Sequence, residues 1–167
     1  MQIQKKAGIG HKELIKNVVN LIEKGNAHAS LDNALKSIPF SLLGEKPGNL
    51  PYSIWQLAEH IRIAQWDILE FSRNAKHVSP KWPDGYWPKE KAPKSKAAWQ
   101  KCIDSIQSDR NAFIELIKNA GDALYDVFEH GDGQSLLKEA FVLADHNSYH
   151  TGELIIIRRL LNAWNNK

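Results

Sequence analysis

Residues 140–161 read AFVLADHNSYHTGELIIIRRLL and have the length and composition of a long helix. At about 100° per residue, its apolar side chains share one broad helical face, and they are Val142, Leu143, Leu154, Ile157, Leu160 and Leu161. His146, His150 and Glu153 lie in the middle of the same face. A buried polar group is costly unless it is hydrogen-bonded or coordinates an ion. The stretch therefore predicts a long buried helix whose polar side chains have a partner.

The rest of the chain carries further amphipathic segments. Ser30, Ser53 and Ser95 stand where helix N-caps are expected, and Gln56 completes a capping box with Ser53. The predicted helices cover residues 11–24, 31–37, 53–74, 95–120 and 135–161. No segment of useful length alternates apolar and polar residues as a strand does. We therefore expect an all-α four-helix bundle, with a short extra helix after the first long one.

Residues 76–94 form the longest segment without helical periodicity. Four prolines exclude regular structure there, and the segment also contains Trp82, Tyr86 and Trp87. A loop so rich in aromatic side chains is expected to pack over one end of the core. At about 3.3 Å per residue, it is also long enough to run the full length of a bundle. Tyr86 and Trp87 are candidates for the wall of a pocket.

Length and composition predict one domain over residues 1–167, with a core from about 11 to 164. The chain has 167 residues, 43% of them hydrophobic, which suffices for one core and is short for two. The net charge of +3 is small and dispersed, which argues against a nucleic-acid partner. The N-terminus lacks the apolar run of a secretory signal, and no apolar run is long enough to span a membrane. Together with a single cysteine, these features predict a cytoplasmic protein.

The histidines are the strongest candidates for a functional site. His146 and His150 stand four residues apart, so both imidazoles project from one helix face and can reach the same ion. His60 lies at the flank of the apolar stripe of the helix predicted over residues 53–74. Helix bundles build metal sites from side chains on facing helices. The residues alone leave two alternatives, which are a metal site formed by His60, His146 and His150 or hydrogen-bonded core histidines.

Two segments carry a resemblance to a known family. DHNSYHTGELIIIRRL, at residues 145–160, resembles the C-terminal signature of the DinB/YfiT-like superfamily, in which a His-x-x-Tyr-His-x-Gly-Gln pattern lies on the last helix. SIWQLAEHIRIAQWD, at residues 53–67, resembles the second-helix segment of that family, whose histidine is the third metal ligand. SLDNALKSIP, PYSIW and KWPDGYWP are also similar to members of one branch. The match covers about residues 14–164, and Glu153 departs from it because the family more often has glutamine there.

This resemblance implies a metal-binding protein with the same ligands. His60, His146 and His150 match the three ligand positions, and the implied cofactor is a divalent ion, zinc or nickel first. The implied fold is a four-helix bundle of up-down-down-up order, with residues 76–94 as the crossover between parallel helices. Dimers are common among similar chains, and the last helix is apolar nearly all round. Such a helix is either enclosed by loops or covered by a partner chain, and we expect a homodimer.

Three imidazoles form an incomplete coordination shell, and the sequence offers no cysteine near them to complete it. Such a site keeps a position open for water or substrate, where a divalent ion lowers the pKa of water to about 7 or activates a thiol. The resembled superfamily includes transferases and isomerases that use the thiols bacillithiol or mycothiol, and also metal-dependent hydrolases. We therefore expect a metal-dependent enzyme, hydrolase or thiol transferase, with a small-molecule substrate. The alternative is a non-catalytic metal-binding or dimerisation module.

Other polar residues are weaker candidates. Asp67 and Glu153 lie close to the ligand stripe, where each is suited to orient an imidazole or move a proton. An ion pair with an arginine such as Arg62 or Arg158 is the equal alternative for these carboxylates. Cys102 is expected to be a packed thiol. The remaining histidines lie in predicted tails, loops or exposed ends and are expected to be solvated: His11, His28, His77 and His130.

Overall fold

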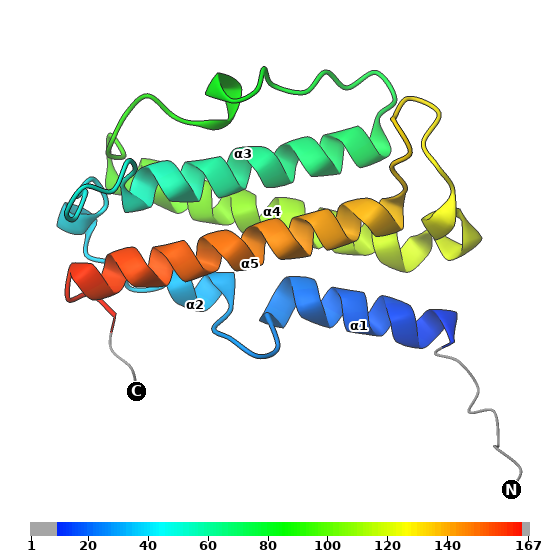
Figure 1. Ribbon diagram of the computed structural model, residues 1–167, viewed down its shortest axis with the longest axis horizontal. Helices are drawn as coiled ribbons and strands as arrows, with labels where there is room; N and C mark the ends of the chain where they lie inside the picture. Colours follow the sequence, from blue (N-terminus) through cyan, green and yellow to red (C-terminus); the bar gives the residue numbers. More distant parts are fainter. Residues whose placement is uncertain (1–9, 165–167) are drawn as a thin grey trace, which may run out of the picture.

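Long helices build residues 10–164, the part of the chain that this computed structural model describes (Figure 1). They are α1 (His11–Lys24), α3 (Ile54–Arg73), α4 (Lys96–Asn119) and α5 (Leu136–Leu160). The shorter elements are α2 (Leu31–Leu35) and the 3-10 turns η1 (Phe40–Leu42), η2 (Asp84–Tyr86) and η3 (Gly121–Tyr125). Within residues 10–164 the one β pairing is an isolated bridge between Val127 and Ser135, so the predicted all-α class is confirmed. The two ends of the predicted domain, residues 1–9 and 165–167, lie outside the described residues. The prediction about a secretory signal falls on the first of these ranges.

Serine side chains cap the starts of α2, α3, α4 and α5, whereas α1 begins after Gly10 without a side-chain cap. Ser53 accepts a hydrogen bond from the Gln56 backbone N–H, and the Gln56 side chain accepts one from the Ser53 N–H, which completes the capping box. Ser30, Ser95 and Ser135 cap α2, α4 and α5 in the same way, each through the backbone N–H three residues ahead. The short helix α2 ends earlier than predicted, because the backbone is already extended at position 36.

The long helices pack side by side and differ in direction. Helix α3 contacts both α4 and α5, and α1 also contacts α4 and α5. Figure 1 shows that α3 and α4 run the same way along the molecule, whereas α1 and α5 run the opposite way. Residues 74–95 return from the end of α3 to the start of α4 alongside α3, with η2 in contact with that helix (Figure 1). This segment therefore lies along the helices and not over one end of the core.

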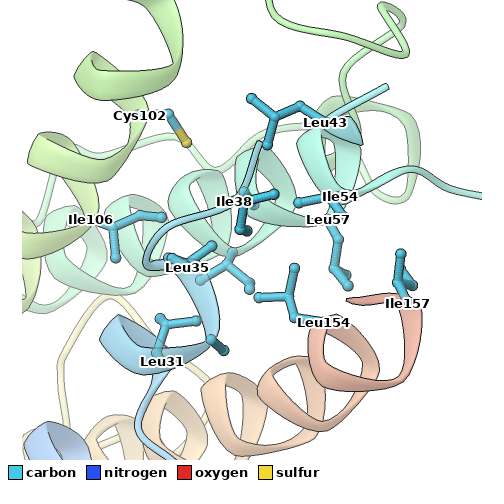
Figure 2. Close-up of a cluster of buried hydrophobic side chains, with 13 residues drawn as sticks. Leu31, Leu35, Ile38, Leu43, Ile54, Leu57, Cys102, Ile106, Leu154 and Ile157 are labelled. Atoms are coloured by element: carbon cyan, nitrogen blue, oxygen red, sulfur yellow. The ribbon is translucent and has the colours of Figure 1, made fainter. Parts of the chain in front are cut away.

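Apolar side chains gather in two clusters at opposite ends of the helices. The first joins α2, the starts of α3 and α4 and the end of α5, and Figure 2 shows these side chains pointing toward one another. Its largest fully buried members are Leu43, Ile54, Leu57, Ile61, Ile106 and Leu154. The second joins α1, the ends of α3 and α4 and the start of α5. Its largest fully buried members are Leu69, Phe113, Ile114, Ile117, Leu124 and Leu143.

A polar layer separates the two clusters halfway along α3 and α5. Gln65 Nε2 donates to the Ile106 carbonyl over 2.6 Å, and Asn147 Nδ2 donates to Gln65 Oε1 over 3.0 Å. His60 and His150 are buried between the same clusters, 4% and 8% exposed. Buried polar groups persist where their hydrogen bonds are satisfied. The layer therefore places imidazoles inside the helix packing at the level of two hydrogen-bonded amides, of which Asn147 keeps a buried Oδ1 atom without a partner.

The buried face of α5 is narrower than the sequence predicts. Leu143, Leu154 and Ile157 are buried, but Val142 and Leu160 are 42% and 58% exposed. At about 100° per residue, both exposed side chains lie at the edge of the predicted face, where neighbouring helices no longer cover them. Although α5 is apolar on much of its surface, no helix within residues 10–164 combines the length and hydropathy needed to cross a membrane.

Candidate metal centre

Three imidazoles from two helices meet between the apolar clusters. His60 projects from α3, and His146 and His150 project from successive turns of α5. The Nε2 atom of His60 lies 3.1 Å from His150 Nε2 and 3.1 Å from His146 Nε2. One nitrogen from each ring lies within 4.8 Å of the other two. The structure thus brings together the three histidines that the sequence singles out.

The outer nitrogens of two of these rings are committed to hydrogen bonds. His60 Nδ1 lies 3.0 Å from the backbone carbonyl of Tyr86, and His150 Nδ1 lies 2.6 Å from Glu153 Oε2. A carbonyl and a carboxylate only accept hydrogen bonds, so both Nδ1 atoms carry the proton and donate. In the neutral tautomer of His60 and of His150, the inward-facing Nε2 atom is therefore a bare lone pair.

Bare nitrogens 3.1 Å apart repel each other unless a cation, either a proton or a metal ion, lies between them. Burial is the largest cause that lowers the pKa of His60 and of His146, the latter to about 4, which disfavours a shared proton at neutral pH. Nitrogens that bind one zinc ion at about 2.1 Å lie about 3.4 Å apart at tetrahedral angles. The donor set therefore fits a divalent metal ion.

A cavity of about 350 Å³ opens beside the three histidines. Its other walls are Ala64, Asp67 and Ile68 of α3 and Trp82, Tyr86 and Trp87 of the segment 74–95. The Trp87 ring stacks on the His60 ring, with centroids 4.0 Å apart and planes within 2°. The segment therefore holds the plane of one imidazole and encloses the space next to all three. Tyr86 and Trp87 do line a pocket.

Comparison with protein-family models finds a match over residues 26–154, described as the DinB superfamily, which covers more than half of the chain. The chain belongs to the DinB superfamily. The matched range includes all three clustered histidines, so the family suggested by the two sequence segments is confirmed. The comparisons with curated proteins and with solved structures returned no match.

Both carboxylates near the site of this DinB superfamily protein bind aromatic residues and not arginines. Glu153 accepts from His150 Nδ1 and, through its other oxygen, from the hydroxyl of Tyr52. Tyr52 also stacks on Trp87, with centroids 5.5 Å apart. The predicted arginine partners are used elsewhere: Arg62 forms a bidentate pair with Glu59, and Arg158 donates to the backbone carbonyls of Asn33, Ala34 and Ala163.

Asp67 fastens the segment 74–95 to α3. Its Oδ1 atom accepts from His77 Nε2 over 2.7 Å, and its Oδ2 atom accepts from the Tyr86 hydroxyl over 2.5 Å. The prediction that His77 is solvated is wrong, because its side chain is only 8% exposed. Sequence reasoning missed this contact because the chain between Asp67 and His77 contains the end of α3 and a turn. These two hydrogen bonds hold the segment against α3 and thereby position the Tyr86 carbonyl, which accepts from His60 Nδ1.

The remaining sequence candidates lie away from the three histidines. His28 and His130 are exposed as predicted, whereas His11 is half-buried and pairs with the Tyr125 hydroxyl over 2.9 Å. Cys102 is 2% exposed, and burial raises the pKa of its thiol, so it is a packed thiol as predicted. Sequence reasoning also missed Tyr52, which stands just before the α3 cap, outside any helical periodicity.

The lowered pKa of His146 predicts an acid-sensitive fold for the metal-free protein. The unfolded chain protonates this imidazole below about pH 6.5, whereas the folded chain keeps it neutral down to about pH 4. The unfolded state therefore binds more protons in this window, and stability falls as the pH drops through it. At about 1.4 kcal/mol per pKa unit, we expect a loss of roughly 3 kcal/mol.

Urea unfolding of chelator-treated protein between pH 7 and pH 4 measures this loss. The variant His146→Gln is expected to show a flatter profile, because glutamine does not titrate. His28→Gln, at an exposed position, serves as the control and is expected to follow the wild type. Parallel profiles for His146→Gln and the wild type would contradict the assignment.

Proposed function

We propose that this DinB superfamily protein is a metal-dependent enzyme in which His60, His146 and His150 hold one divalent ion, zinc or nickel first. The observation that carries the proposal is the convergence of three Nε2 atoms, two of them on rings whose Nδ1 atoms are already committed to hydrogen bonds. Neutral imidazoles are ligands for zinc, nickel, iron and copper, so the ligand type leaves the choice among these metals to experiment.

The proposed reaction is hydrolysis or thiol transfer on a small molecule. When bound, a divalent ion supplies Lewis acidity to a water molecule or a thiol at the position that three imidazoles leave open. Glu153 and the Tyr86 carbonyl hold the Nδ1 protons of His150 and His60, which keeps both Nε2 lone pairs directed inward. The ring of Trp87 covers one face of His60 and excludes water from it.

The cavity beside the histidines supports an enzyme over the alternative of a non-catalytic metal-binding module. Structural zinc sites are closed by four protein ligands, commonly with cysteines, whereas catalytic sites have three and leave space for a substrate. Among the described residues, no fourth histidine, cysteine or carboxylate joins His60, His146 and His150 in the group that could hold an ion. The space next to them, about 350 Å³, is of the size that small ligands occupy.

Elemental analysis together with an activity panel tests the proposal. Protein expressed without an affinity tag is expected to contain about one divalent ion per chain. The loaded protein is expected to turn over a member of a panel of neutral esters, amides and thiol acceptors, and a chelator should abolish that turnover reversibly. Failure to retain zinc or nickel on dialysis contradicts the metal centre. A metal that raises the Tm without any turnover favours the non-catalytic module.

We also propose the finer architecture and a homodimer. The directions of α1, α3, α4 and α5 support an up-down-down-up bundle in one domain, with residues 74–95 as the crossover (Figure 1). Support for the homodimer comes from apolar side chains exposed along one face of α5, namely Phe141, Val142, Tyr149, Ile156 and Leu160. Sedimentation is expected to give twice the chain mass, and Ile156→Glu is expected to give monomers. A monomeric wild type contradicts the homodimer.

A further inference from the structure

We propose that the cavity beside the histidines binds an uncharged aromatic ring of the substrate, with Trp82 as the residue that contacts this ring. The inference rests on the proposed function and adds a substrate class to it. Trp82 lines the cavity from the segment 74–95 and is 70% exposed. A large indole held at the mouth of a cavity offers an apolar face that a bound ring can cover.

The Asp67 carboxylate and two of the three imidazoles in the cavity wall are already committed to hydrogen bonds, and the unpartnered Nδ1 atom of His146 is buried. Both oxygens of Asp67 accept hydrogen bonds, from His77 and from the Tyr86 hydroxyl. The Nδ1 atoms of His60 and His150 donate to Tyr86 and Glu153. Away from the three Nε2 atoms, the wall therefore offers a substrate mainly apolar surface, from Ala64, Ile68, Trp82 and Trp87. A substrate group that needs many hydrogen bonds would lose more to desolvation than this wall returns.

Charge argues against an anionic substrate group in the same place. Among the described residues that line the cavity there is no lysine or arginine, and Asp67 contributes a carboxylate. Away from the ion proposed at the three histidines, a carboxylate or phosphate on the substrate would therefore meet the Asp67 carboxylate and no cationic side chain of the wall. This disfavours a small thiol carrying several carboxylates and favours a neutral aryl ester, amide or thioether.

A ring contact with Tyr86 orients the Trp82 indole. The Trp82 ring lies 5.5 Å from the Tyr86 ring at 59°, and Tyr86 is itself tied to Asp67. The indole is thus presented on a fastened segment, so less entropy is lost when a ligand stacks on it. A cavity of about 350 Å³ accommodates one ring together with the reacting group.

Hydroxamates that share one metal-binding group and differ in the remainder test the proposal. Isothermal titration of zinc-loaded protein is expected to show that benzohydroxamate binds about tenfold more tightly than acetohydroxamate. Trp82→Ala is expected to remove most of that difference while the affinity for acetohydroxamate stays constant. Val78→Ala, at an 84% exposed position on the same segment, is the matched control and should change neither affinity. A carboxylate at the para position of benzohydroxamate is expected to weaken binding.

Equal affinities of the wild type for benzohydroxamate and acetohydroxamate would overturn the aryl subsite. So would a Trp82→Ala variant that loses the same factor of affinity for both hydroxamates. Saturation-transfer NMR with benzamide on the metal-free protein separates this outcome from failure of the metal centre. A benzamide signal that Trp82→Ala abolishes supports the subsite even if the protein binds no zinc. No signal from benzamide and no aryl preference in the loaded protein overturns the subsite while leaving the metal proposal intact.

Discussion

Replacing His60 with alanine is expected to lower the zinc affinity by roughly a thousandfold, a loss of about 4 kcal/mol. The substitution removes one of three imidazoles, and the two that remain, His146 and His150, come from a single helix. Zinc binding free energies of about 10–16 kcal/mol in four-ligand sites indicate several kcal/mol per ligand. His146→Ala and His150→Ala are expected to have effects of the same size. Competition with a chromophoric chelator measures the affinities.

His28→Ala is the matched control for these variants. His28 is an exposed histidine that contacts Ser148 of α5, so its loss changes the histidine count without touching the three rings. Circular dichroism should show the same helical content in all four variants. Zinc affinity that survives His60→Ala within tenfold, with the helices intact, would mean that His60 is not a ligand and would overturn the proposed function.

Replacing Glu153 with alanine is expected to lower the zinc affinity by about 10- to 100-fold, as is typical for groups that orient a metal-binding histidine. Glu153 accepts the Nδ1 proton of His150 over 2.6 Å and thereby fixes its tautomer and its ring orientation. In Glu153→Gln the amide oxygen can still accept that proton, so we expect a loss severalfold smaller than in Glu153→Ala. This comparison also tests the departure from the family pattern, which more often has glutamine at this position.

Two further variants show whether the loss arises at His150. Tyr52→Phe removes the hydroxyl that donates to Glu153 and keeps the ring that stacks on Trp87, so we expect a smaller effect in the same direction. Glu115→Ala removes an exposed carboxylate on α4 that pairs with Lys118 and is expected to leave the zinc affinity unchanged. If Glu153→Ala and Glu115→Ala behave alike, Glu153 does not position His150.

Residues that act within one helix were predictable from the sequence. A serine cap depends on a backbone N–H three residues ahead, and the pair His146 and His150 depends on one helical turn, so both can be derived from spacing. Contacts between distant segments were not predictable. Tyr52, whose hydroxyl donates to Glu153, stands 101 positions earlier in the chain. The acceptor for His60 Nδ1 is the backbone carbonyl of Tyr86, which any residue at that position would provide. His77 was misassigned for the same reason.

Helical periodicity and capping are local properties, so the all-α class, the helix starts and the placement of three histidines on two helices can be read from the sequence. Tertiary packing brings the three Nε2 atoms together, lays the segment 74–95 along α3, and pairs Asp67 with His77 and Glu153 with His150 in place of arginines. These features depend on how separate helices and a long connection pack together. Only that packing sets distances between residues far apart in the chain and leaves bare lone pairs facing one another.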